Sequence, residues 1–381
     1  MPILPKPKRG KPLEVKTRPV PFSFWPVYKT TRRAGIHSTL FALDPWNVII
    51  ASIKKDCPTG SKDEAKACVE QAQDFYNASL TATLASARPL LLYYSFMNLV
   101  KAYGLTKGIA PTFERATHGV SEQLGPGGVE LQDAFLEAFP SPQASTDKRQ
   151  VFDDFNQALG TTGLGASHRF DLKQLMPQVV AGHRLWCEAA DEDERFISIE
   201  RIAIHHDATS KELRLNLYVF ADDLSRFGIS HAKFLTDSRL GADFREVKTT
   251  LTIRKRKLLR FEQINPVKYT GRAADMLQTV VDSLRHKVWV TVSEGIPYRR
   301  YYAYMAPVPD HGHIIPQLLA IYGVVFYLGS ITRYRPHHFD RILEGDYGAW
   351  VREFIIGQPV QFIYLLATEF AQQEVTKPAI V

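Results

Sequence analysis

The feature that most constrains the fold is a change in hydrophobic period along the chain. Apolar residues recur at three- and four-residue spacing in about 44–104 and again after 311, as they do on helices. Runs such as "KELRLNLYVF" (211–220) and "KVWVTVSE" (287–294) instead alternate apolar and polar residues, which is the period of strands. We therefore expect an α+β fold: a helical bundle built from the N- and C-terminal helices, with a β-rich antiparallel insertion between them.

The same change in pattern divides the 381-residue chain into parts. Residues 1–20 carry basic residues among prolines, a composition that predicts a flexible basic arm. Residues 21–190 are expected to form the first part of a helical domain, and residues 308–381 its C-terminal part. The β-rich insertion is expected to span residues 191–307. A chain of this length is long enough for two or three domains.

Local signals predict where several helices begin. Asp44 followed by Pro45 places a capping carboxylate before the residue that best opens a helix. The stretch 61–84 begins with a serine followed by acidic residues, which suits a helix N-terminus. A further helix is expected over 171–189, and another inside the β-rich part at 272–286.

Two helices are apolar on nearly every side, which predicts that they are buried. In the helix expected over 88–104, Asn98 and Lys101 are the polar exceptions, and buried polar groups need partners. The stretch 314–331 is about as long as a short membrane span. Because it contains Pro316 and further polar or glycine positions, we interpret it as a buried core helix.

Charge and cysteine content limit the functional classes. The formal charge is +7, with a pI near 9.1, which favours anionic partners but also fits a basic surface without a partner. The three cysteines are widely spaced and form no C-x-x-C pair, so neither a disulfide framework nor a zinc ribbon is expected. With no apolar signal region at the N-terminus, we expect a cytoplasmic protein.

The most unusual polar cluster is "RYRPHHFDR", residues 333–341, which directly follows the apolar stretch 314–331. Arg335 precedes Pro336, so the first helix should end near 332–334 and a second should open at the proline. This bend would gather guanidinium groups and imidazoles beside a buried helix. We refer to residues 333–338 as the arginine corner.

The arginine corner has two readings. A guanidinium holds a phosphate in a two-pronged manner, and an imidazole moves protons near neutral pH, which together suit metal-free RNA cleavage. In that reading Arg333 and His338, or His337, are catalytic and Arg335 binds phosphate, with His118, Tyr334 and Asp340 in support. In the structural reading the arginines only cap a helix, bonded to carbonyls or to nearby acidic residues.

A second basic run, "TIRKRKLLR" at 252–260, is the densest in the chain. On a strand, Arg254 and Arg256 would face one way and Lys257 the other. These three side chains are candidate phosphate contacts, while a solvated edge strand protected by charge is the alternative. The histidine pairs 205–206 and 311/313 lack the spacing and carboxylates of a metal site, so no metal and no cofactor are expected.

Three separated blocks are similar to the YaaC-like proteins of bacteria: "SARPLLLYYSFMNLVKAYGL" (86–105), "THG" (117–119) and "FYLGSITRYRPHHFDRI" (326–342). The resemblance covers the helical parts, roughly 20–120 and 310–375. It singles out the His118–Gly119 pair and the run from Arg333 to Pro336, and it implies no particular activity.

The spacing from Arg333 to His338 also resembles the R-x4-6-H motif of HEPN ribonucleases, in which two copies of a helical bundle face one RNA strand. Tyr334 and Pro336 depart from the usual motif. This resemblance implies a HEPN-like, metal-independent ribonuclease or nucleic-acid-acting effector in anti-phage defence, acting as a homodimer and on RNA rather than DNA. The alternative is a non-enzymatic scaffold or regulator that binds a partner protein or nucleic acid through basic surfaces. No membrane partner is expected in either case.

Overall fold

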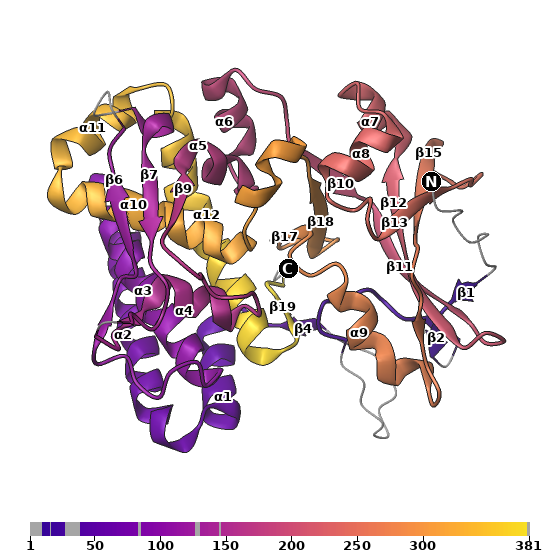
Figure 1. Ribbon diagram of the computed structural model, residues 1–381, viewed down its shortest axis with the longest axis horizontal. Helices are drawn as coiled ribbons and strands as arrows, with labels where there is room; N and C mark the ends of the chain where they lie inside the picture. Colours follow the sequence, from indigo (N-terminus) through magenta and orange to yellow (C-terminus); the bar gives the residue numbers. More distant parts are fainter. Residues whose placement is uncertain are drawn as a thin grey trace. The chain divides into compact units, whose positions relative to one another are not determined.

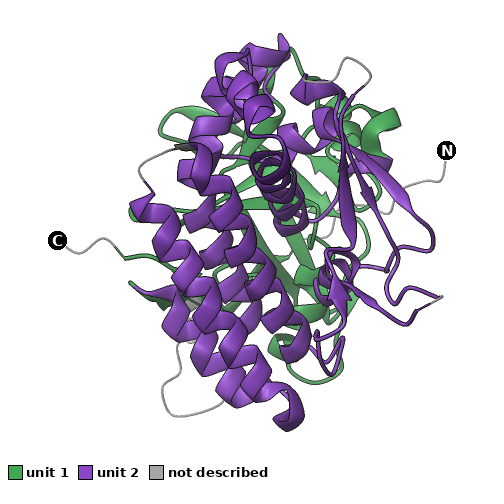
Figure 2. Cartoon of the chain, turned by 90° about the vertical axis from the view of Figure 1, so that its left-hand side faces the viewer, with its two compact units in different colours: residues 1–43, 195–311, 372–381 green, residues 44–194, 312–371 purple. Residues whose placement is uncertain are grey.

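The computed structural model describes residues 10–15, 17–26, 39–82, 85–125, 130–144 and 146–378. The chain divides into two compact units, coloured separately in Figure 2. Unit 1 comprises residues 1–43, 195–311 and 372–381, and unit 2 comprises residues 44–194 and 312–371. Helices and mainly antiparallel sheets occur together, so the fold is α+β, as the change in hydrophobic period predicts.

Unit 2 contains the long helices and a few short strands (Figure 1). Its helices are α1 (Pro45–Asp56), α2 (Lys62–Thr81), α3 (Arg88–Thr106), α4 (Val151–Ala158), α5 (Leu172–Leu175), α6 (His183–Ala190), α10 (Gln317–Tyr334), α11 (Pro336–Glu344) and α12 (Gly348–Ala371). Its strands are β5 (Ala116–Thr117), β6 (Val120–Gln123), β7 (Phe135–Ala138), β8 (Arg149–Gln150) and β9 (His168–Asp171).

The helices begin where the local chemistry predicts. The Asp44 carboxylate accepts a hydrogen bond from the Trp46 amide at the start of α1, the capping interaction expected before Pro45. Helix α3 contacts both α2 and α10, and α1 contacts α12. The rings of Phe96 and Phe362 stack with centroids 3.9 Å apart, which ties α3 to α12. Helices from both ends of the sequence thus share the core of unit 2.

A glycine allows the close approach of α10 to α3. A Cβ atom at Gly329 would lie 2.8 Å from the Cβ of Tyr93 and 3.0 Å from the carbonyl oxygen of Pro89. Both distances are shorter than packed atoms tolerate, so a larger residue at this position would push the helices apart. The contact matters for the site, because α10 ends in the arginine corner and α3 carries Tyr93.

The prediction of one continuous helix over 171–189 is wrong. The chain forms α5, then a 3₁₀ turn (Met176–Gln178), then α6. Pro177 lies in the turn, and Gly182 before α6 has a left-handed backbone with φ of 79°, so the helical hydrogen bonding is interrupted between them. The sequence pattern also predicts two separate helices, over 348–357 and 359–375, but residues 348–371 form one helix, α12, with Pro359 inside it.

Unit 1 contains most of the strands (Figure 1). They are β1 (Lys11–Pro12), β2 (Glu14–Val15), β3 (Arg18–Pro19), β4 (Thr39–Phe41), β10 (Phe196–Ile199), β11 (Arg201–Asp207), β12 (Glu212–Phe220), β13 (Phe244–Val247), β14 (Thr252–Ile253), β15 (Arg256–Gln263), β16 (Val267–Lys268), β17 (Val288–Val292), β18 (Arg299–Tyr304) and β19 (Glu374–Thr376). Its helices are α7 (Ala221–Arg226), α8 (His231–Asp237) and α9 (Leu277–Asp282).

The main sheet of unit 1 has the strand order β1-β11-β12-β15-β13. Its central strand, β12, is buried along its whole length. Leucines at 213, 215 and 217 face an apolar core. Because side chains alternate across a strand, Glu212, Arg214 and Asn216 face the opposite side. One side of the sheet is therefore apolar, and part of the other is a buried polar layer.

Both ends of the chain differ from the expected pattern. Within the predicted flexible arm, the described residues 10–15 and 17–20 instead contain the short strands β1, β2 and β3, with Leu13 and Val20 buried; residues 1–9 and 16 lie outside the described part. At the other end, the sequence pattern predicts a helix through Val375, but residues 374–376 form strand β19, which pairs in parallel with β4.

Within the described residues, one helix is long and apolar enough to cross a membrane by length and composition alone. It is α12, and 67% of its most apolar window is buried inside the protein. Helix α10, from the stretch considered above as a short membrane span, is buried from Leu318 to Ile331. It is a core helix, as interpreted from the sequence.

Candidate functional site

The arginine corner lies between two helices, where the sequence predicts it. Helix α10 ends at Tyr334, and α11 begins at Pro336. The Arg335 amide still donates to the Ile331 carbonyl oxygen, while the Arg335 carbonyl oxygen accepts from the amides of His338 and Phe339. Arg335 therefore closes one helix and opens the next, and the bend is fixed by backbone hydrogen bonds.

Arg333 is exposed at the last turn of α10 and faces the aromatic residues of α3. Its Nη1 donates to the Tyr94 hydroxyl oxygen at 2.7 Å. Its guanidinium carbon also lies 4.9 Å from the centroid of the neighbouring Tyr334 ring. These contacts orient the guanidinium without neutralising it, because neither partner is a carboxylate.

Arg335 points to a different partner. Its Nη1 lies 3.2 Å from the Glu122 carboxylate of β6, and the pair is partly buried. This ion pair ties the arginine corner to β6. An arginine held by a carboxylate is a poorer phosphate ligand than a free one, so the geometry favours a structural role over the predicted phosphate-binding role for Arg335.

The remaining predicted residues of the corner lie on the first turns of α11. His337 is exposed, His338 is half-buried, and their rings meet edge to face with centroids 4.4 Å apart. Partial desolvation, followed by the charges of His337, Arg341 and Arg335, lowers the pKa of His338. Asp340 is exposed. Among the described residues, no arginine of the corner pairs with it.

His118 is held by a loop that only glycine allows. Gly119 has a φ of 75°, and a Cβ atom there would lie 2.8 Å from the carbonyl carbon of Gln150. The His118 carbonyl oxygen accepts from the Phe152 amide at the start of α4, and the Gly119 carbonyl oxygen accepts from the Phe139 amide. The His-Gly pair therefore places His118 just before β6, with its backbone hydrogen-bonded to the start of α4.

The His118 ring contacts α3 and α10. Its Nδ1 forms a short hydrogen bond with the Tyr93 hydroxyl group, and its ring lies 6.0 Å from that of Phe326, centroid to centroid. The Tyr93 hydroxyl lies 3.5 Å from the Met97 sulfur, to which it can donate. When it does so, its oxygen accepts a hydrogen bond from Nδ1–H, and the neutral ring then has its lone pair on Nε2.

Two cations act on His118. Burial lowers the pKa of the imidazole, and the positive charges of Lys101 and Arg333 lower it further, while Glu122 opposes them. The ring is consequently neutral at pH 7, because its pKa lies below the usual 6.5. A neutral imidazole beside an ammonium and a guanidinium combines a base with positive charge for an anionic substrate.

The structure thus brings some of the predicted residues together and separates others. Arg333 and His118 share one environment, which we call the His118 site, together with Tyr93, Tyr94 and Lys101. The charges that act on His338 come from His337, Arg341 and Arg335 instead. Sequence reasoning missed Tyr93 and Tyr94 as functional residues, although Lys101 already stood out as a charge on an otherwise apolar helix.

The basic run at 252–260 does not form the single strand that was expected. Arg254 and Lys255 have φ values of 48° and 65° and form the two-residue turn between β14 and β15, a hairpin geometry usually adopted by Asn-Gly. Arg256 is committed to the carboxylates of Asp222 and Asp223. Arg254 and Lys257 are exposed. Of the three candidate phosphate contacts, Arg256 alone is paired with Asp222 and Asp223.

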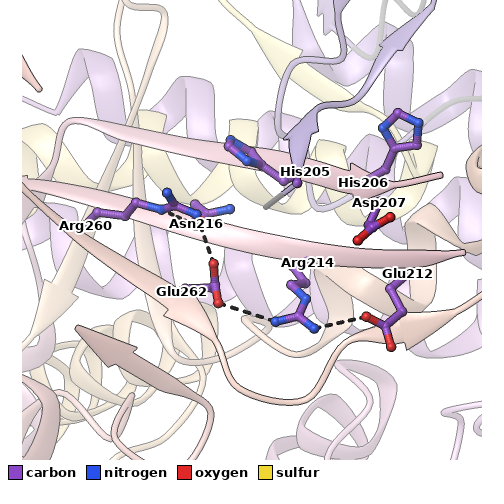
Figure 3. A pocket seen from close by; sticks show the side chains of 9 residues that line it. His205, His206, Asp207, Glu212, Arg214, Asn216, Arg260 and Glu262 are labelled. Atoms are coloured by element: carbon purple, nitrogen blue, oxygen red, sulfur yellow. Dashed lines mark hydrogen bonds and ion pairs between the residues drawn. The ribbon is translucent and has the colours of Figure 1, made fainter. Parts of the chain in front are cut away.

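Unit 1 contains a small polar pocket on the polar side of its main sheet (Figure 3). Glu262 accepts from three guanidinium groups, those of Arg214, Arg245 and Arg260, at 2.9–3.3 Å. Arg214 also pairs with Glu212. The pocket has room for about one water molecule. Each of the three guanidinium groups is paired with a carboxylate, so we interpret the pocket as a structural network that provides partners for the polar side chains of β12.

His205 lines this pocket, and burial lowers its pKa to about 4, with the charges of Arg260 and Arg201 adding to the effect. Neither His205 nor His206 belongs to a metal site: in the described parts of both units, no group of three or more histidine, cysteine, aspartate or glutamate side chains could hold a metal ion. The three cysteines are free thiols.

Comparisons with known proteins give one match. The sequence matches the YaaC-like protein family over residues 39–370, which includes His118, Gly119 and the arginine corner. No curated protein matches the chain, and no solved structure matches it. Because the matched region covers most of the sequence, the chain belongs to the YaaC-like protein family.

Proposed function

We propose that this protein is a metal-independent ribonuclease whose base is His118. The observation that carries the proposal is a half-buried imidazole with a lowered pKa, flanked by the cationic Lys101 and Arg333. Positive charge beside a neutral imidazole suits a phosphodiester, because the base needs its lone pair while the phosphate needs cations. This assigns the base to His118 and leaves His338 and His337 a supporting role.

The proposed reaction uses the 2′-hydroxyl of RNA as its nucleophile. His118 Nε2 takes the proton from this hydroxyl, and the 2′-oxygen then attacks the adjacent phosphorus. Lys101 and Arg333 stabilise the negative charge that develops on the phosphoryl oxygens. The bond from phosphorus to the 5′-oxygen breaks, and the leaving oxygen takes a proton from water. The hydroxide that remains takes the proton from His118, which restores the neutral base. The products are a 2′,3′-cyclic phosphate and a free 5′-hydroxyl.

The proposal keeps the wider setting inferred from the sequence. It treats the long helices of unit 2 as a bundle of the HEPN type, which would dimerise around one RNA strand, and the protein as a cytoplasmic effector in anti-phage defence. Arg335 would hold the arginine corner against β6 through Glu122, so that Arg333 stays oriented. The exposed Arg254 and Lys257 would add phosphate contacts outside the site.

The test is incubation of the full-length protein with end-labelled single-stranded RNA in EDTA. We expect cleavage with 2′,3′-cyclic phosphate ends and no cleavage of DNA of the same sequence, which lacks the nucleophile. An RNA with one 2′-deoxy position should resist cleavage only there. His231→Ala, which removes a half-buried histidine of unit 1 that pairs with Glu246, is the matched control and should keep full activity.

Two results would overturn the proposal. One is an intact RNA after incubation with the purified protein, including when its partners are supplied. The other is equal cleavage by a His118→Gln preparation, which would assign the activity to a contaminant or to another residue.

A second candidate function rests on the internal bonds of the arginine corner. Arg333 donates a hydrogen bond to Tyr94, and Arg335 is paired with Glu122. These contacts hold α10 against α3 and β6. In this reading the protein is a non-enzymatic scaffold or regulator that binds a partner protein or nucleic acid through its basic surfaces. If this is the function, the protein binds a nucleic acid or a partner protein, and His118→Gln still binds it. Neither the wild type nor His118→Gln then cleaves RNA.

A further inference from the structure

The surface beside Arg333 contains a row of aromatic rings. Tyr334 is 60% exposed at the end of α10. The guanidinium of Arg333 lies over the Tyr334 ring and donates to Tyr94. Tyr94 in turn stacks on Phe75 of α2, with centroids 5.4 Å apart and planes 27° from parallel. Phe75 and Tyr94 are both half-buried.

The row therefore runs from Tyr334 through Arg333 and Tyr94 to Phe75, and every link is a direct contact. Arg333 lies over the ring face of Tyr334 and donates to the hydroxyl of Tyr94. A cation beside aromatic rings is the arrangement that proteins use for unpaired nucleic acid: the cation holds a phosphate, and the ring faces stack on bases. A phosphate monoester or a paired duplex would have no use for the rings, because its bases are absent or already stacked.

We infer that Tyr334 is a stacking platform for an unpaired base of a single-stranded nucleic acid whose phosphate is held by Arg333. The inference rests on the proposed function and specifies its substrate as single-stranded. Tyr334 is the specificity-determining residue, because its ring is the most exposed of the row and is the one that a base can cover. Tyr94 and Phe75 support the other side of Arg333.

The experiment measures binding of the full-length protein to three fluorescent oligonucleotides: a single-stranded DNA, the same strand with one abasic position, and the same strand in a duplex. DNA is used because it stacks like RNA but cannot be cleaved by the proposed reaction. We expect the single strand to bind about tenfold more tightly than the abasic strand, the effect of one base–aromatic stack, and more tightly than the duplex.

Variants assign this preference to Tyr334. Tyr334→Ala should bind the intact and abasic strands equally, whereas Tyr334→Phe, which keeps the ring, should retain the preference. Ile356→Ala is the matched control, because Ile356 is similarly exposed on α12 of the same unit; it should behave like the wild type.

Failure of this inference can be told apart from failure of the proposed function. Equal binding of intact and abasic strands by the wild type, or a preference that survives in Tyr334→Ala, would overturn the platform even if RNA is cleaved. A Tyr334-dependent preference without any RNA cleavage would support the platform and count against the ribonuclease.

Discussion

At the scale of single residues, the functional account depends on the charge state of His118. Burial, followed by the charges of Lys101 and Arg333, lowers its pKa below 6.5, so the neutral form that acts as a base persists below that pH. The rate should therefore fall only as the pH drops through this lowered pKa, when the imidazole takes up a proton.

Lys101→Met tests this coupling. Removing one cation should raise the pKa of His118, so the acidic limb of the kcat/KM profile should move to higher pH. Loss of a phosphate contact should also raise KM. A pH–rate profile of the variant that overlays that of the wild type would show that Lys101 does not act on the base.

Arg333→Lys separates two-pronged phosphate binding from simple positive charge. Lysine keeps the charge but not the planar fork, so we expect roughly a tenfold loss of kcat/KM with an unchanged melting temperature, because Arg333 is exposed. The matched variant is Arg254→Lys at the exposed turn of unit 1. A larger loss there than at Arg333 would place the phosphate contacts on the other basic surface.

At the scale of elements, the loop that carries His118 is held in place by Gly119. Gly119→Ala adds a Cβ atom 2.8 Å from Gln150 at a φ of 75°, and we expect it to destabilise the fold by about 1–3 kcal/mol and to reduce activity. Gly108 has a similar φ of 69° but open space around it, so Gly108→Ala is the control for backbone strain alone. Equal unfolding free energies in urea for the two variants would exclude the steric clash.

The elements also show what the sequence can and cannot predict. The start of α1 at Asp44–Pro45 and the bend at Arg335–Pro336 follow from local chemistry, and both are confirmed. The hairpin turn at Arg254–Lys255 was missed, because arginine and lysine rarely adopt a left-handed backbone. Strand β19 was missed for a different reason: it is extended because it pairs with β4, far away in the sequence.

At the scale of the whole molecule, each unit is assembled from segments that are distant in the sequence. His118 and Arg333 come together in this way. Arg333 is on α10 and His118 contacts Tyr93 of α3, so the two side chains share an environment only when α10 packs on α3. Hydrophobic period predicts which segments are buried but not which ones meet. For this reason, the sequence singled out both His118 and Arg333, but the role of base was assigned to His338, which is nearer to Arg333 in the sequence.

Unit 1 requires the C-terminal end of the chain. The Val375 carbonyl oxygen accepts from buried Arg299 at 2.7 Å, and the Glu374 carboxylate accepts from Tyr301 at 2.8 Å. Truncation after Ala371 should therefore destabilise unit 1 by at least about 2 kcal/mol, with faster hydrogen exchange in β4 and β18. Unchanged protection of these strands would show that β19 contributes little to the unit.

The most direct test of the central claim compares RNA cleavage in EDTA by two single variants, His118→Ala and His338→Ala, under identical conditions. The account predicts a loss of about 10²- to 10⁴-fold for His118→Ala, the usual effect of removing a general base, and a much smaller loss for His338→Ala. The reverse order of effects would contradict it, because the base would then lie in the arginine corner rather than beside Tyr93.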